Sequence, residues 1–175
     1  MRDSTGEELQ NVFRSWIQEH RGLIFKVAGG FARTEPDRQD LTQEILLQIW
    51  RSAPRYKPKA KVSTWIYRVA LNTALAWRRR ERKHAAQVPL LEIDDLAADC
   101  PDGLLTQDRE LVEALYGAIR ELPKVDACLV LMYLDDLSYR EMAEIAGISE
   151  DNVGVKLNRA RRALAELMKE VAHES

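Results

Sequence analysis

The stretch LSYREMAEIAGISEDNVGVKLNRARRAL, residues 137–164, decides the fold of the C-terminal part of the chain. Ser138 followed three residues later by Glu141 forms a capping box, which begins a short helix. Gly147 suits the left-handed conformation in which many helices end. Ser149 then caps a second helix whose first turn is acidic. A helix, a three-residue turn containing glycine and another helix together predict a helix-turn-helix.

The second helix of this motif, expected over Glu150–Val171, has one apolar and one polar face. The residues expected to be buried are Val153, Leu157, Ala160, Leu164 and Leu167. The opposite face carries Asp151, Asn152, Val155, Lys156, Arg159 and Arg162. Such a face suits the major groove of DNA, because early residues reach base edges and later cations meet phosphates. A solvated basic face on a packed helical hairpin is the alternative, and the Gly-Ile-Ser turn favours the DNA-binding motif.

Apolar residues recur at helical spacing along the rest of the chain, whereas patterns typical of strands are rare. Four helices before residue 85, with short connections, predict a small bundle. Proline residues end two of the expected helices. The expected helices are Glu8–His20, Gly22–Arg33, Asp37–Ala53, Ser63–His84, Arg109–Glu121, Lys124–Leu134 and Ser138–Ala146.

The charge is distributed in blocks, although the net charge is only −2. Residues 51–83 hold eleven Lys or Arg residues and the single acid Glu81, whereas residues 85–108 hold six acids and no base. Pro89, Pro101 and Gly103 interrupt the acidic block, which we interpret as an interdomain linker. Blocks of opposite sign indicate separate electrostatic roles, so the low net charge does not exclude a nucleic-acid partner.

The basic block includes a stripe along one helix and a Lys-rich loop before it. The stripe consists of Arg68, Asn72, Ala76, Arg79 and Lys83. It could follow a phosphate backbone, and Asn72 could read a base. A solvated charged face is the alternative, but the run of residues 77–83 concentrates so many like charges that an anion is expected opposite them. The loop 56–62 lies beside Trp65, which is either a stacking platform for an unpaired base or a core residue.

Several classes of protein have no support in the sequence. No apolar run approaches the ~18 residues that span a bilayer, and the first ten residues lack a hydrophobic secretion core. We therefore expect a cytoplasmic protein without membrane insertion. Cys100 and Cys128 are far apart, and His20, His84 and His173 are scattered, so neither a disulfide nor a metal site is expected. Without a nucleophile–base pair or a phosphate-binding loop, we expect no enzyme and no cofactor.

Two long segments resemble a known family. The string DLTQEILLQIWRSAPRYKPKAKVSTWIYRVALNTALAWRRRERK, residues 40–83, resembles region 2 of bacterial sigma factors. The string ELPKVDACLVLMYLDDLSYREMAEIAGISEDNVGVKLNRARRALAELM, residues 121–168, resembles their region 4. Their order, the acidic linker and the absence of a region 3 domain are similar to the extracytoplasmic-function (ECF) group of the sigma-70 family. The resemblance implies an all-α fold: a region 2 four-helix bundle (1–84), an acidic linker (85–108) and a region 4 helix-turn-helix domain (109–175).

The resemblance also implies partners and residues. The helix with the D-x-x-Q-E motif binds the β′ clamp helices of core RNA polymerase, which the family contacts together with the β subunit. The residues at these positions are Asp40, Gln43, Glu44, Leu47 and Arg51. Helical periodicity independently places this stripe opposite the apolar positions Leu41, Ile45 and Ile49.

Promoter DNA is the second implied partner. The loop before the T-W-I-Y-R motif captures a flipped base of the non-template −10 strand, and the helix after it contacts the same element. Binding of the unpaired base offsets the few kcal/mol of unstacking. The implied −10 residues are Lys57, Lys59, Lys61, Ser63, Trp65, Arg68, Asn72, Arg78, Arg79, Arg80, Arg82 and Lys83. The implied −35 residues are Asp151, Asn152, Val155, Lys156, Arg159 and Arg162.

The family habit further implies an alternative sigma factor that responds to stress or extracytoplasmic signals. An anti-sigma factor would cover its polymerase-binding surfaces, and the acidic linker would thread towards the polymerase active-site cleft. Gly154 and Val155 stand where many members have Lys or Arg with Ser, and Pro58 replaces a usual Gly. These departures affect which −35 and −10 sequences are preferred.

Two other functions compete with this interpretation. A stand-alone helix-turn-helix regulator would explain residues 137–164 but not the polar stripe of residues 40–51 or the basic helix. A sigma-mimicking adaptor that binds an anti-sigma factor would not need the basic stripes. Promoter-directed initiation therefore accounts for more of the sequence than either alternative.

Overall fold

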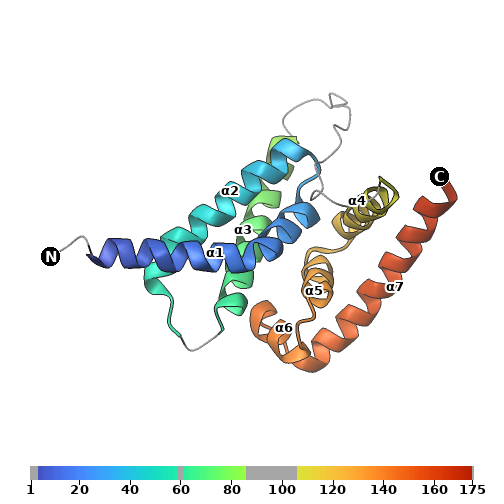
Figure 1. The fold of residues 1–175 in the computed structure, drawn as a ribbon. Coiled ribbons are helices and arrows are strands. Elements are labelled where there is room, and N and C mark those ends of the chain that lie inside the picture. The colour runs from blue at the N-terminus through green and yellow to red at the C-terminus, as the bar shows by residue number, and fades with distance from the viewer. Residues whose placement is uncertain (1–3, 59–60, 86–105, 175) are drawn as a thin grey trace.

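The computed structural model describes residues 4–58, 61–85 and 106–174 (Figure 1). Within these ranges it contains seven α-helices and one 3-10 turn. They are α1 (Ser4–Phe31), α2 (Glu35–Ser52), η1 (Ala53–Arg55), α3 (Val62–Ala85), α4 (Thr106–Glu121), α5 (Lys124–Leu134), α6 (Tyr139–Ala146) and α7 (Glu150–Glu174). The expected all-α fold is confirmed. Most of the acidic linker, residues 86–105, lies outside the described residues.

The N-terminal unit is built from α1, α2 and α3, which pack against one another. Thr34 caps α2 by accepting a hydrogen bond from the backbone N–H of Asp37 at 3.3 Å. The apolar stripe of α2, Leu41, Ile45 and Ile49, is fully buried, as its spacing predicts. The polar stripe of α2 therefore points away from the core.

The first helix is longer than expected. Residues 8–33 were expected to form two helices, but α1 is continuous from Ser4 to Phe31. The break was expected before Gly22, but glycine inside a helix costs only about 1 kcal/mol relative to alanine and does not by itself end it. Burial of Ile24, Val27 and Phe31 against the other two helices offsets this cost. The N-terminal unit thus has three α-helices and a 3-10 turn.

The C-terminal unit contains the helix-turn-helix. The capping box of Ser138 and Glu141 begins α6, and Gly147 ends it with a φ of 68°. Ser149 accepts a hydrogen bond from the backbone N–H of Asn152 at 3.3 Å at the start of α7. In helix α5 every residue from Asp126 to Met132 is buried. A helix that is apolar all round needs neighbours on every face, and α7 covers only part of it.

The remaining faces of α5 are covered by α4, α6 and the N-terminal unit. Helices α4 and α5 pack against α1, and α6 packs against α3 (Figure 1). Two adjacent glycines of α1 permit the close approach: a Cβ at Gly30 would lie 2.8 Å from Leu131 Cδ1, and one at Gly29 would lie 3.3 Å from the ring of Tyr116. The buried residues of both units consequently form one continuous core.

The length and polarity of the helices decide whether any of them could span a membrane. Within the parts of the chain that the structure describes, every helix is too short or too polar to cross a membrane.

Candidate nucleic-acid and polymerase interfaces

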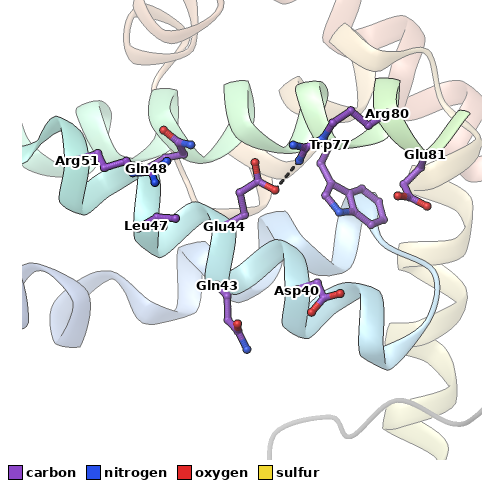
Figure 2. Close-up of a pocket in the computed structure, with 9 residues that line it drawn as sticks. All are labelled: Asp40, Gln43, Glu44, Leu47, Gln48, Arg51, Trp77, Arg80 and Glu81. Carbon is purple, nitrogen blue, oxygen red and sulfur yellow. Dashed lines mark hydrogen bonds and ion pairs between the residues drawn. The ribbon is translucent and has the colours of Figure 1, made fainter. Parts of the chain in front are cut away.

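A groove between α2 and α3 gathers the residues expected to bind polymerase (Figure 2). It encloses about 780 Å³ and is lined by Asp40, Gln43, Glu44, Leu47, Gln48, Arg51, Trp77, Arg80 and Glu81. All five predicted residues of α2 are among them. Leu47 is 43% exposed, which is unusual for a leucine beside a well-packed core. Hereafter this surface is called the α2–α3 groove.

Arg80 belongs to this groove although its sequence position suggested a −10 contact. Its Nη2 atom donates to Glu44 Oε2 at 2.5 Å, and Figure 2 shows the side chain turned from α3 towards α2. Gln43 points away from α3 in the same view. The ion pair fixes the carboxylate of Glu44 above the groove. The groove thus presents a paired acid, free amides and an exposed aliphatic side chain together.

The three consecutive arginines of α3 point in different directions. Arg78 donates to the carbonyl oxygen of Arg120 in α4 at 2.8 Å, Arg79 is exposed and Arg80 faces α2. Successive residues of a helix are rotated by about 100°, so a run of like charges cannot all face one partner. Arg68 and Asn72 are exposed on α3, and Arg68 Nη2 donates to the carbonyl oxygen of Glu144 at 2.6 Å. The side chains of Arg82 and Lys83 lie outside the described part of the chain.

The loop before α3 lies beside a cluster of three aromatic rings. Trp65 is half-buried, with its ring centroid 5.5 Å from that of Trp16 and 5.1 Å from that of Tyr56. Trp65 therefore packs within this aromatic cluster, and its role as a stacking platform for an unpaired base stays a prediction. Lys57 and Lys61 are exposed, Ser63 is half-buried, and Lys59 lies outside the described residues.

An ion pair lies at the end of this loop. Lys61 Nζ lies 2.8 Å from Glu141 Oε1 in the capping box of α6. Lys61, followed by hydrogen bonds from the backbone and hydroxyl of Ser138, lowers the pKa of Glu141 to about 2.

The face of α7 expected to read the −35 element is open. Asp151, Asn152, Val155 and Arg162 are exposed, and Lys156 is half-buried. Val155 is 71% exposed, the highest value among the large apolar residues of the described chain. An aliphatic side chain at this place on the helix offers a contact for a thymine methyl group.

Gly154 is not required by crowding at this surface. A Cβ at this position would meet Tyr139 at 3.5 Å, an ordinary van der Waals distance. Its departure from the usual family residue therefore has no steric cause in the structure.

Arg159 has a structural partner that the sequence did not reveal. Its Nη2 atom lies 3.1 and 2.9 Å from the two carboxylate oxygens of Asp126, and Nε donates to Oδ2 at 3.3 Å. Asp126 is 2% exposed in the first turn of α5. An acid at a buried position of an otherwise apolar helix requires such a partner. Asp126 itself was the signal that could have predicted the pair.

A second cluster that sequence reasoning missed joins the two units. Arg38 Nη2 lies 2.7 Å from both oxygens of Glu113, and Arg120 Nη2 donates to Glu113 Oε1 at 2.8 Å. Burial alone would raise the pKa of Glu113, but the hydrogen bonds from both arginines outweigh it and lower the pKa. Arg120 Nη1 also donates to the carbonyl oxygens of Gly29 and Ala32 at the end of α1. Only three-dimensional proximity connects these residues.

Comparisons with known proteins identify both units. Residues 16–84 match the family described as Sigma-70 region 2, and residues 112–164 match that described as Sigma-70, region 4. The chain is 26% identical over 178 residues to the ECF RNA polymerase sigma factor SigE of Mycolicibacterium smegmatis, covering 99% of this chain and 68% of that protein. It is 25% identical over 174 residues to the ECF RNA polymerase sigma factor SigW of Bacillus subtilis, covering 93% and 91%.

Solved structures show the same fold. The sigma factor RpoE, in its co-crystal structure with the anti-sigma factor NepR from Bartonella quintana, matches with a TM-score of 0.66 at 19% identity, covering 89% of this chain and 98% of that one. CnrH, in complex with the cytosolic domain of CnrY, matches with a TM-score of 0.64 at 19% identity, covering 92% and 90%. With both regions matched in the expected order, the chain belongs to the sigma-70 family, in the ECF group of RNA polymerase sigma factors.

Proposed function

We propose which residues carry out the tasks of this sigma factor, which binds core RNA polymerase, recognises the −10 and −35 promoter elements and directs transcription initiation. Sigma factors are initiation factors rather than enzymes. The proposal assigns polymerase docking and −10 binding to residues 1–84, a connecting role to 85–108 and −35 binding to 109–175. One observation carries it: the five predicted polymerase-binding side chains of α2 line a single groove opposite the buried core.

The α2–α3 groove would dock the β′ clamp helices. A helix that packs into it would cover Leu47 and exchange hydrogen bonds with Gln43 and Asp40. Truncation of a hot-spot residue at the centre of an interface costs about 2 kcal/mol or more, roughly a thirtyfold loss of affinity. We therefore expect Leu47→Lys to weaken binding of core polymerase strongly, measured by fluorescence anisotropy of the labelled chain.

Leu111→Lys is the matched control for this experiment. Leu111 is 60% exposed on α4, outside the groove, and the substitution introduces the same charge. Its affinity for core polymerase should stay within about twofold of the unaltered chain, since surface substitutions away from an interface change little. Equal affinities of the two variants would contradict the assignment of the groove.

The −10 strand would run along the loop before α3 and the exposed stripe of that helix. Arg68 and Arg79 would meet phosphates, and Asn72 would contact a base. In run-off transcription with core polymerase and genomic fragments, Arg68→Gln and Asn72→Ala should reduce initiation while leaving core binding unchanged. No initiation by the unaltered chain on any fragment would reject the assignment of promoter-directed initiation to these residues.

The −35 element would be read by the first two turns of α7. Asn152 is placed for a base edge, Val155 for a thymine methyl group, and Lys156 and Arg162 for phosphates. Removal of one phosphate contact should reduce the salt slope of duplex binding by about 0.9. A Val155→Ser substitution should instead change which base is preferred at one position. Unchanged base preference with Val155→Ser would contradict that contact.

Control by an anti-sigma factor in the cytoplasm is the last part of the proposal. It is supported by the two solved relatives, whose structures are complexes with an anti-sigma factor or with the cytosolic domain of CnrY. A tagged chain isolated from native cells should retain a second protein that core polymerase displaces. Recovery of polymerase alone would contradict this control.

A further inference from the structure

Arg159 is held differently from the other cations on the exposed part of α7. Its partner is the carboxylate of Asp126, whereas Lys156 and Arg162 form no ion pair among the residues that the structure describes. Arg161 instead lies over a tyrosine ring of α5, with its Cζ atom 5.0 Å from the ring centroid. In this part of α7 the orientation of one guanidinium, that of Arg159, is therefore set by a carboxylate.

The carboxylate of Asp126 occupies one edge of the guanidinium. Nε of Arg159 donates to Oδ2 at 3.3 Å, and Nη2 lies 3.1 and 2.9 Å from Oδ1 and Oδ2. Nη1 takes part in none of these bonds, and it carries two of the five N–H groups of an arginine. The outer edge of the guanidinium, which includes Nη1, thus stays available to a second acceptor while the inner edge is fixed.

Burial fixes the inner end of this pair. Asp126 is buried in the first turn of α5, whereas the side chain of Arg159 is exposed. Helices α5 and α7 pack against each other (Figure 1), and the buried residues Leu157 and Ala160 anchor α7 next to Arg159. Both the carboxylate and the backbone that carries the guanidinium are therefore held in place by packing.

Arg159 also lies on the face of α7 that meets DNA in the proposed function. Asn152, Val155 and Arg159 follow one another at spacings of three and four residues, which places them on one side of the helix. A phosphate attracts any cation near it, whereas a base edge requires a donor at a defined place. A guanidinium that is partly neutralised and fixed in orientation consequently suits a base edge better than a phosphate.

We propose that Asp126 is a positioning residue for promoter recognition, because it holds the guanidinium of Arg159 where this side chain reads one base pair of the −35 element. The inference rests on the proposed function, in which α7 reads that element. Asp126 itself does not touch the DNA, since it is buried at the contact between α5 and α7. Guanine is the expected base, because its O6 and N7 atoms are the acceptors that arginine contacts most often.

The base preference of the holoenzyme tests this role. The probe is a genomic fragment on which the unaltered chain initiates with core polymerase, with its −35 base pairs randomised. Bound fragments are separated from unbound ones and sequenced, which gives a preference ratio for each base pair. Arg159→Ala should abolish the preference at one base pair. Asp126→Asn should lower it there by about fivefold or more, the lower end of what a specific arginine contact contributes.

Asp136→Asn is the matched control. Asp136 is exposed in the turn after α5, belongs to the same unit and forms no ion pair among the described residues. The substitution removes the same charge, so any general effect of charge on DNA binding appears in both variants. The preference ratios of Asp136→Asn should equal those of the unaltered chain. If Asp126→Asn and Asp136→Asn give the same ratios, the proposal is wrong.

A double variant separates positioning from a merely structural role. If Asp126 acts through Arg159, Asp126→Asn should change no preference ratio in the Arg159→Ala background. A loss of stability alone would weaken binding of all fragments alike and leave the ratios unchanged. Either a uniform loss of affinity with unchanged ratios, or a changed ratio in the Arg159→Ala background, would contradict the proposal. Circular dichroism at the assay temperature verifies that each variant is folded.

Arg159→Lys keeps the proposal testable if Asp126→Asn fails to fold. Lysine preserves the charge opposite Asp126, but it is a point charge without the planar fork of arginine. We expect the preference at the same base pair to be lost. Binding to fragments without the favoured base should stay within about twofold, because the charge is kept. Retention of the preference by Arg159→Lys would show that orientation of the fork is not needed, and would overturn the proposal.

The outcomes distinguish this inference from the proposed function. Preferences that respond to Arg159→Ala but not to Asp126→Asn would overturn the inference alone. Preferences that respond to Val155→Ser but not to Arg159→Ala would do the same. An unaltered holoenzyme without preference at any randomised position would reject the −35 assignment of α7, and the inference with it.

Discussion

Removal of the Arg159 guanidinium is expected to destabilise the C-terminal unit, although this residue lies on the exposed face of α7. The side chain of Arg159 is 65% exposed, while that of Asp126 is only 3% exposed. Arg159→Ala would leave a buried carboxylate without its charged partner. Breaking a fully buried pair costs 3–5 kcal/mol, and hydrogen bonds to charged groups contribute about 1.5–3 kcal/mol. Because water can reach the guanidinium side of this pair, we expect about 2 kcal/mol.

Thermal unfolding followed by circular dichroism measures this loss. For a chain of this size about 2 kcal/mol corresponds to a fall in Tm of roughly 4–8 °C. Arg162→Ala is the matched control, because Arg162 is exposed one turn further along and forms no ion pair among the described residues. An exposed substitution of this kind changes the free energy of unfolding by no more than about 0.5 kcal/mol. The Tm of Arg162→Ala should therefore change by no more than roughly 2 °C.

A double variant separates the ion pair from the loss of packing. If the unpaired carboxylate is the cause, Asp126→Ala in the Arg159→Ala background should restore part of the stability, since removing both partners leaves no buried charge. Equal Tm values for Arg159→Ala and Arg162→Ala would refute the reasoning. In that case any loss of −35 affinity by Arg159→Ala would report a DNA contact alone.

Three further outcomes follow from the same structure. Lys61 and the Ser138 hydrogen bonds lower the pKa of Glu141 from 4.5 to about 2, so its contribution is complete above the usual pKa and is lost as the pH falls towards 2. The Tm difference between the unaltered chain and Glu141→Gln should therefore shrink between pH 5 and 3, and a constant difference would contradict this. Gly147→Ala should lower the free energy of unfolding by about 1 kcal/mol, because its φ of 68° disfavours a side chain, and an unchanged urea midpoint would argue against it. Leu131→Ala should cost about 2–5 kcal/mol, since its fully buried side chain joins both units; a urea midpoint within error of the unaltered chain would show that the contact between units contributes little.

The helix-turn-helix was predictable because its signals are local. A capping box, a left-handed glycine and a second capping serine fix the ends of α6 and the start of α7 within a few residues of chain. The stripe of α2 was predictable for a similar reason, since one helical period decides both the buried and the exposed face. The division of α1 into two helices was wrong because glycine is a weak signal whose cost tertiary packing offset.

The contacts between the two units were not predictable from such patterns. Glu113 of α4 pairs with Arg38 of α2, and no local pattern in the sequence marks a partner so far along the chain. The arginine run at residues 78–80 looked uniform in sequence, yet its members face α4, solvent and α2. Local periodicity gives the direction of each side chain but not what stands in that direction.

Glu141 shows how a satisfied local pattern conceals a long-range contact. Its place in the capping box already explains an acid at this position, so nothing in the sequence calls for a second partner. A carboxylate nevertheless has about four acceptor sites, and the Ser138 groups leave Oε1 free to meet Lys61. One residue can therefore begin α6 and hold the two units together. Because Gln preserves the first role and removes the charge needed for the second, Glu141→Gln separates the two.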